Sequence, residues 1–225
     1  MQRIFDICFS GVALIMLSPL LLPLMFLLRV TGEGEIFFPQ NRVGREGKYF
    51  KLYKFSTMLK NSPNVGTGTV TVKNDPRILP LGGFLRDTKI NELPQLINIF
   101  KGDMSVIGPR PQTQRCFDAF PLSAQNEIKK VRPGLSGIGS IIFRNEEDMM
   151  HANNDPDKFY DEIVMPYKGS LEDWYVSNQS IGSYFSLIGL TVWVVLSSNS
   201  GLIWAMFKDL PEPPAELKKP LNYTD

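Results

Sequence analysis

Histidine and cysteine, the residue types behind most protein metal sites and many covalent enzymes, are almost absent from this sequence. Among 225 residues there is one histidine, His151, and two cysteines, Cys8 and Cys116, which lie far apart and form no Cys-x-x-Cys motif. This excludes a site of several imidazoles and most serine or cysteine triads, and it argues against disulfide frameworks and thiolate zinc sites. Catalysis is therefore expected from carboxylates, Lys, Arg and the backbone.

An excess of charge of one sign is also lacking. The chain has 24 Lys and Arg against 23 Asp and Glu, a formal net charge of +1, and 43% apolar residues. This balance argues against a disordered tail protein, and it excludes a nucleic-acid partner, which would require a marked basic excess. The length suits one large or two small domains with a real core.

The stretch from Ile7 to Leu28 contains no charge at all. As one straight helix at about 1.5 Å per residue it would cover a hydrocarbon core of about 30 Å, so it predicts a membrane segment. Pro19 and Pro23 each remove a helical hydrogen bond, and the Ser18 hydroxyl can satisfy a carbonyl released in this way. We interpret residues 1–29 as a helix bent at Ser18-Pro19 that enters and leaves the bilayer by the same face.

Two alternatives to this re-entrant helix remain open. A simple transmembrane anchor is one, because kinked spanning helices are common. A secretory signal peptide is the other, although Arg29-Val30-Thr31 offers no small-residue cleavage site. The positive-inside rule predicts a cytoplasmic location for the chain that follows. The basic residues on which this rests are Arg29, Arg42, Arg45, Lys48, Lys51, Lys54 and Lys60.

A second uncharged stretch runs from Ile181 to Phe207, interrupted by Ser197-Ser198-Asn199-Ser200-Gly201. Residues 186–196 predict a helix and residues 202–207 a short piece with aromatic side chains suited to a membrane interface. Buried core helices are an equal alternative. Several prolines then predict an irregular tail over residues 211–225.

The middle of the chain, within residues 30–210, predicts one compact α/β domain, mostly helical, that rests against the membrane. Short strands are expected at residues 37–40 and 49–55, around the turn at 44–47. From Leu79 the apolar spacing predicts a helical face that ends at Gly102. Asn61 to Asp75 is predicted to be a surface loop, and Asn145 to Asp161 is a second polar stretch.

Guanidinium and carboxylate groups are concentrated between Arg86 and Pro111. Arginine forks and helix N-termini suit phosphate oxygens, and neighbouring carboxylates suit a divalent cation that bridges a diphosphate. The pattern predicts a phosphorylated substrate with Mg²⁺. Pro109 and Pro111 restrict the backbone around Arg110. In Arg132-Pro133-Gly134 a proline restricts the backbone next to Arg132 in the same way. Alternatively, Asn91 is a helix cap and the arginines form surface ion pairs.

These residues resemble the signature of the bacterial sugar transferases, the small monotopic phosphoglycosyl transferases. That signature resembles Asp-Glu-Leu-Pro-Gln-Leu, then Lys-Gly-Asp-Met-Ser, then Gly-Pro-Arg-Pro, here within residues 91–111. The resemblance covers nearly the whole chain. It includes Ser18-Pro19, Gln40-Asn41-Arg42-Val43-Gly44, Lys54-Phe55-Ser56-Thr57-Met58, Asn74-Asp75-Pro76-Arg77 and Val131-Arg132-Pro133-Gly134-Leu135-Ser136-Gly137.

The resemblance implies transfer of a phospho-sugar from a UDP-sugar to a polyprenyl phosphate such as undecaprenyl phosphate, with release of UMP. This reaction initiates surface glycan synthesis, and the implied location is the cytoplasmic face of the bacterial inner membrane. The implied fold is a small α/β membrane-associated domain with a re-entrant helix and interfacial helices. Mg²⁺ is the implied cofactor, with Glu92 at the metal-associated position. The expected phosphate-binding residues are Lys54, Arg86, Arg110 and Arg132. Oligomeric state is left open, a homo-oligomer included.

The sequence departs from the family at Asn91, where the family has its nucleophilic aspartate. An amide has no charge and a delocalised lone pair, so Asn91 cannot form the phospho-sugar intermediate. Three explanations are open: an introduced substitution, a natural variant in which another carboxylate acts, or a catalytically silent homologue that binds without turnover. Asp87, four residues earlier, would share the face of Asn91 on a continuous helix and is the candidate surrogate, with Glu92 as the other.

Ser56 is a second departure, because the family often has Arg at this position, so one phosphate or headgroup contact is expected to be missing. Two functions from other classes are alternatives to the transferase. One is a membrane-anchored scaffold without catalysis, and the other is an ordinary glycosyltransferase that releases UDP.

Overall fold

The computed structural model describes residues 1–62, 75–151, 155–197 and 201–223, and the predicted loop from Asn61 to Asp75 falls mostly outside them. The chain forms two compact units. The larger unit comprises Met1–Asp6, Arg42–Phe50 and Gly102–Asp225, and the smaller unit comprises Ile7–Asn41 and Lys51–Lys101. Each unit is therefore built from segments that are separated in the sequence. The predicted division into residues 1–29, 30–210 and 211–225 stays a prediction.

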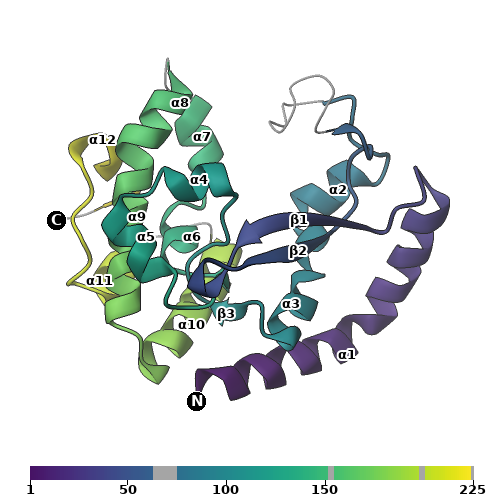
Figure 1. Ribbon diagram of the computed structural model, residues 1–225, viewed down its shortest axis with the longest axis horizontal. Helices are drawn as coiled ribbons and strands as arrows, with labels where there is room; N and C mark the ends of the chain where they lie inside the picture. The colour runs from purple at the N-terminus through teal and green to yellow at the C-terminus, as the bar shows by residue number, and fades with distance from the viewer. Residues whose placement is uncertain (63–74, 152–154, 198–200, 224–225) are drawn as a thin grey trace. The chain divides into compact units, whose positions relative to one another are not determined.

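The first helix, α1 (Gln2–Val30), continues through both internal prolines, and Figure 1 shows it as one uninterrupted ribbon. The Ser18 hydroxyl donates to the carbonyl of Ile15 at 2.8 Å. Large apolar side chains such as Ile15 and Met16 are about three-quarters exposed, at 75% and 74%. Among the described residues, α1 is the one helix long and apolar enough to cross a membrane. Membrane association is thus consistent with the fold, while the re-entrant form stays a prediction.

The two predicted strands are confirmed as β1 (Phe37–Val43) and β2 (Tyr49–Phe55), which pair in a two-stranded sheet (Figure 1). The turn between them is η1 (Arg45–Gly47), in which Glu46 has a φ of 60°. In the smaller unit, the buried Asn98 amide accepts from the Tyr53 N–H at 3.0 Å and donates to the Lys51 carbonyl at 2.8 Å. This amide bonds the edge of β2 to α3 (Gln95–Lys101).

The apolar face predicted to run on from Leu79 is broken into three short elements. They are α2 (Gly82–Asp87), the 3₁₀ turn η3 (Ile90–Glu92) and α3. Lys89, between the first two, has a left-handed backbone with φ 59°, which ends a right-handed helix. The prediction of one face was wrong because nothing about a lysine signals this conformation. The predicted end at Gly102 is confirmed, since its φ is +99°.

The larger unit has a helical core around a parallel pair of short strands, β3 (Ser105–Ile107) and β4 (Gly134–Ser136). Its core is contributed largely by α6 (Ile138–Ile142), α9 (Met165–Ser177), α10 (Ile181–Ser197) and α11 (Leu202–Met206). The other described segments of this unit are α4 (Gln114–Asp118), α5 (Leu122–Ile128), α7 (Glu146–His151), α8 (Pro156–Phe159), the π-helical segment Tyr160–Val164 and α12 (Ala215–Lys218). The mostly helical α/β prediction is confirmed.

Helix α10 combines the two alternatives that the sequence left open. Tyr184, Leu187, Leu190 and Val194 are buried in the core of the larger unit, whereas Trp193 and Leu196 are 48% and 80% exposed. One face is therefore core and the other presents large apolar side chains. The tail is less irregular than expected, because α12 forms there and Leu217 and Leu221 reach the core.

Candidate functional site

Asn91 and Glu92 occupy η3, the tight turn that precedes α3 in the smaller unit. The Asn91 side chain is 9% exposed, and within the described part of the chain its Oδ1 has no hydrogen-bond partner. The alternative of Asn91 as a helix cap is therefore wrong, since a capping oxygen would accept a backbone N–H. A buried, unpaired acceptor costs free energy, which a hydrogen bond from a ligand or an ordered water would offset.

Glu92 forms an ion pair with Lys54, a residue of β2, with Lys54 Nζ 2.8 Å from Glu92 Oε1. The two side chains are 19% and 20% exposed, so solvent screens the pair only in part. The structure thus brings together two of the predicted site residues, Lys54 and Glu92, and Asn91 is the residue before Glu92 in the same turn.

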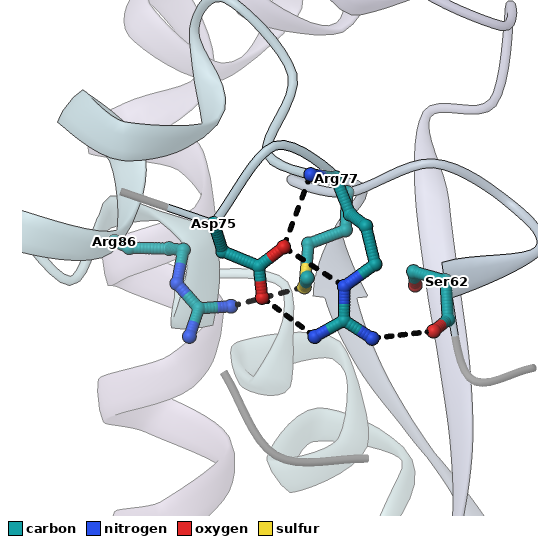
Figure 2. Close-up of polar contacts among 5 residues, drawn as sticks. Ser62, Asp75, Arg77 and Arg86 are labelled. Atoms are coloured by element: carbon teal, nitrogen blue, oxygen red, sulfur yellow. Dashed lines mark hydrogen bonds and ion pairs between the residues drawn. The ribbon is translucent and has the colours of Figure 1, made fainter. Parts of the chain in front are cut away.

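Arg86, on α2, belongs to the same unit, and its Nη1 lies 3.6 Å from the sulfur of Met58. Figure 2 shows it near a second polar group, in which the Arg77 guanidinium donates from Nε to Asp75 Oδ1 at 2.8 Å and from Nη1 to the Ser62 carbonyl at 2.7 Å. Asp75 and Arg77 are 5% and 4% exposed. The Asn-Asp-Pro-Arg motif thus contributes a buried ion pair that joins the backbone at Ser62 to the segment preceding α2.

Asp87 is exposed at the last residue of α2, and the chain reverses at Lys89 before it reaches Asn91. The two residues are consequently not on one helix. The four-residue spacing that suggested Asp87 as a surrogate loses its physical basis, and its catalytic role stays a prediction.

Arg110 and Arg132 lie in the larger unit, each beside one of the paired strands. The strands and their flanks approach closely at glycines: a Cβ on Gly108 would lie 2.5 Å from the Arg132 carbonyl oxygen, and one on Gly134 would lie 2.1 Å from the Gly108 nitrogen. The Gly-Pro-Arg-Pro and Arg-Pro-Gly motifs therefore interlock through backbone contact. The exposed Arg110 is held at this junction.

A buried carboxyl group behind Arg110 was missed by sequence reasoning. Glu172 of α9 is 3% exposed and accepts backbone N–H groups of Gly139 and Arg110. Burial raises the pKa of the Glu172 carboxyl to about 7, against the lowering effect of Lys168 and these N–H groups. Lys168 itself contacts Glu146, and burial lowers the pKa of its ammonium. The only sequence signal was the spacing of Lys168 and Glu172, which is also typical of an exposed helical ion pair.

The side chains of Asn91 and Glu92 in η3 carry oxygen donors of the kind that suit Mg²⁺. Glu92 supplies a carboxylate and Asn91, the residue before it, an unpaired amide oxygen, and oxygen is the ligand type that Mg²⁺ prefers. Among the described residues, no group of three or more His, Cys, Asp or Glu could hold a metal. Mg²⁺ often takes only one or two protein carboxylates and completes its shell with phosphates and water, so this set suits a metal brought with a diphosphate.

Comparison with known proteins identifies relatives. The exopolysaccharide production protein ExoY of Rhizobium meliloti is 35% identical over 159 residues, which cover 64% of this chain and 70% of the relative. The undecaprenyl-phosphate galactose phosphotransferase of Salmonella typhimurium is 33% identical over 211 residues, 87% of this chain and 40% of the relative. The UDP-glucose:undecaprenyl-phosphate glucose-1-phosphate transferase of Klebsiella pneumoniae is 37% identical over 154 residues, 66% of this chain and 32% of the relative.

The last two relatives are thus much longer proteins, and the chain spans well under half of each. The family model described as bacterial sugar transferase matches residues 1–198, which include the Asn91-Glu92 turn, Arg110 and Arg132. On this match, the chain belongs to the bacterial sugar transferase family.

Proposed function

We propose that this protein transfers a phospho-sugar from a UDP-sugar to a polyprenyl phosphate, the first step of a surface glycan. The observation that carries the proposal is the Lys54–Glu92 ion pair at η3, where the preceding residue, Asn91, has a buried and unpaired oxygen. The names of two relatives support it, because they specify undecaprenyl phosphate as acceptor and a sugar phosphate as the group transferred.

In this reaction an oxygen of the acceptor phosphate forms a bond to the phosphorus that carries the sugar. The bond from that phosphorus to the bridging oxygen breaks, and its electron pair leaves with UMP. Bound Mg²⁺ would neutralise part of the negative charge of the diphosphate. Glu92 would hold the metal, Lys54 would approach the phosphate oxygens on leaving its ion pair, and Asn91 would contribute its neutral oxygen. Because Asn91 cannot act as nucleophile, the acceptor attacks directly.

The placement of α1 in the membrane is part of the same proposal. We infer that its exposed apolar side chains lie in the bilayer, and that the helix bends at Ser18-Pro19 so that both ends remain at the cytoplasmic face of the inner membrane. The support is the length and apolarity of α1 and the side-chain hydrogen bond of Ser18 to Ile15. This would bring the protein to the depth of the acceptor's phosphate.

The released nucleotide tests the reaction type. The full chain in lipid nanodiscs is incubated with Mg²⁺, undecaprenyl phosphate and a panel of UDP-sugars, and nucleotides are separated by chromatography. The proposal expects UMP with at least one sugar. UDP would instead show an ordinary glycosyltransferase, and no product with any sugar would favour the silent homologue.

The variant Asn91→Asp is the matched probe of the site. It restores the carboxylate of the family signature with almost the same shape, so UMP release is expected to rise by about a hundredfold or more. Asp87→Ala is the control and is expected to change the rate less than about twofold, because Asp87 lies beyond the reversal at Lys89. A large loss in Asp87→Ala with no gain in Asn91→Asp would identify Asp87 as the working carboxylate.

A further inference from the structure

The loop that carries Arg110 is bonded through its main chain to other segments of the larger unit. The Pro109 carbonyl accepts from the Gly134 N–H at 2.8 Å, and the Gln112 carbonyl accepts from the Val43 N–H at 3.0 Å. These hydrogen bonds lie on both sides of Arg110 in the sequence. They restrict where the Arg110 side chain can leave the backbone.

A side chain supplies the hydrogen bond at Arg110 itself. Pro109 and Pro111 have no N–H, so the main-chain donor of this tripeptide is the N–H of Arg110. It donates to the Glu172 carboxyl of α9, which also accepts the N–H of Gly139, the second residue of α6. Glu172 therefore joins the Arg110 loop to two helices.

The Glu172 carboxyl occupies a buried and closely fitted position. The side chain is 3% exposed, and a Cβ on Gly139 would lie 2.4 Å from Glu172 Oε1. A glycine at the start of α6 thus leaves the room that the carboxyl fills. Because the carboxyl is packed this closely, its position fixes the position of the N–H groups that it accepts.

The charged groups around Glu172 are also held in place. Lys168, one turn earlier on α9, attracts the Glu172 carboxylate and pairs with Glu146, with Nζ 2.5 Å from Glu146 Oε1. The same Nζ lies 4.9 Å from the centre of the Phe143 ring. The charge of Arg110 acts on Lys168 as well, and Arg110 itself is exposed. A buried charged cluster therefore lies behind an exposed guanidinium.

We propose that Glu172 is a positioning residue for the transferase reaction, because it fixes the main chain of Arg110 and thereby aims the guanidinium at the diphosphate of the donor. This inference rests on the proposed function and on the phosphate-binding role predicted for Arg110. Glu172 acts through Arg110 and does not contact the donor. Arginine–phosphate contacts are directional, so a displacement of about 1 Å is enough to weaken them strongly.

The affinity for UDP tests this inference without requiring turnover. UDP with Mg²⁺ is titrated by calorimetry into the full chain in lipid nanodiscs at pH 8, above the pKa of about 7 that burial gives the Glu172 carboxyl. Glu172→Leu removes the acceptor and is expected to weaken UDP binding about tenfold, as for the loss of one charge-assisted hydrogen bond. Glu172→Gln keeps an acceptor oxygen and should bind UDP within about threefold of the unmodified chain.

A second background separates positioning from a general loss of stability. When Arg110→Ala is already present, Glu172→Leu should change the UDP affinity less than about twofold, because the guanidinium that it positions is absent. Glu172→Asp keeps the charge but withdraws the carboxyl by one methylene group. It is expected to weaken binding about fivefold, and it replaces the leucine variant in the cycle if thermal melts show that the latter does not fold.

Glu146→Gln is the matched control, because it removes the other carboxylate that contacts Lys168 and belongs to α7, not to the Arg110 loop. It should change the UDP affinity less than about twofold. An effect as large as that of Glu172→Leu would overturn the inference, since it would reflect damage to the buried cluster in general.

The remaining outcomes distinguish this inference from the proposed function. Unchanged UDP affinity in both Glu172→Leu and Glu172→Asp would overturn the positioning role and leave the proposed function intact. Equal weakening by Glu172→Leu with and without the Arg110 side chain would also overturn the positioning role alone. Absence of UDP binding to the unmodified chain would overturn the proposed donor, and this inference with it.

Discussion

The chemistry proposed at η3 depends on the amide of Asn91, where the signature that this sequence resembles has an aspartate. Asn91 has nearly the shape of aspartate, so the turn keeps its place, and its unpaired oxygen stays neutral beside a charged Glu92. Because the Asn91 amide is uncharged, it cannot act as the nucleophile. It also does not repel the carboxylate of Glu92, as an aspartate at this position would. The departure at Asn91 can be recognised in the sequence because the residues that follow it match the family signature closely. The sequence could not predict that the oxygen is unpaired, since that depends on which backbone groups the fold brings near.

The Lys54–Glu92 pair makes a prediction about stability. Lys54→Met leaves a mostly buried carboxylate without its ammonium, and Glu92→Gln does the converse. Each single change is expected to cost about 1–2 kcal/mol of the free energy of unfolding, and the double variant less than the sum by about 1 kcal/mol. Denaturant melts in detergent measure these values. Additive costs, within about 0.3 kcal/mol, would show that the two groups do not interact.

The raised pKa of Glu172 predicts how the stability of the folded protein depends on pH. Its pKa is about 7 in the folded protein against 4.5 for the unperturbed group, because burial disfavours the charged form. The folded carboxyl binds its proton more tightly than the unfolded one, so its contribution to stability is full below pH 4.5 and is lost as pH rises through about 7. The loss is on the order of 1–3 kcal/mol.

Glu172→Gln keeps an acceptor for the Gly139 and Arg110 N–H groups and removes the titration. Thermal melts from pH 4 to pH 8 should therefore fall less steeply with pH for this variant than for the unmodified protein. Glu216→Gln, at an exposed residue of α12, is the control and should leave the slope unchanged. Parallel slopes for Glu172→Gln and the unmodified protein would contradict the assignment.

At the scale of elements, local patterns were sufficient where propensity and packing agree. The aromatic-rich runs on either side of the Gly44–Gly47 turn predicted β1 and β2, and the apolar run at residues 186–196 predicted most of α10. Prediction failed where the deciding contact is distant or the conformation is rare. Lys89 broke an expected helix, and Leu217 and Leu221 packed into the core from a proline-rich tail.

The left-handed turn at Lys89 can be tested directly. A non-glycine residue pays about 1–2 kcal/mol to adopt this conformation, so Lys89→Gly is expected to be neutral or to raise the free energy of unfolding by up to about 1 kcal/mol. Lys89→Val, with a β-branched side chain, should lower it by about 1–2 kcal/mol. Urea unfolding of both variants provides the comparison. Equal stability of the valine and glycine variants would mean that the turn relaxes.

For the whole molecule, the near-zero net charge conceals a strong separation of charge along the chain. Charge is absent from most of α1, whereas α9 carries a buried lysine and a buried glutamate, Lys168 and Glu172. The opening residues were predicted only as part of a membrane helix. Gln2 nevertheless donates to the Ser105 hydroxyl and the Ile107 carbonyl, and Asp6 accepts from the same strand. Such pairings between distant segments carry no local signal in a sequence.

The orientation of α1 is tested by labelling with a membrane-impermeant maleimide. In a background with Cys8→Ser and Cys116→Ser, single cysteines replace Ile4 and Val30, which are 64% and 60% exposed at the two ends of α1. A re-entrant helix predicts that both react in inverted membrane vesicles and neither in intact spheroplasts. Ile15→Cys, near the middle, should be protected in both. Reaction of one end from each side would instead establish a spanning anchor.

The fate of the phosphorus that carries the sugar tests phospho-sugar transfer most directly. A UDP-sugar labelled with ³²P at that position is incubated with the full chain in nanodiscs, Mg²⁺ and undecaprenyl phosphate, and the products are partitioned between butanol and water. We expect the label to enter the lipid phase in step with UMP released into water, and to do so faster with Asn91→Asp. Label that stays in water as UDP while sugar enters the lipid would contradict it.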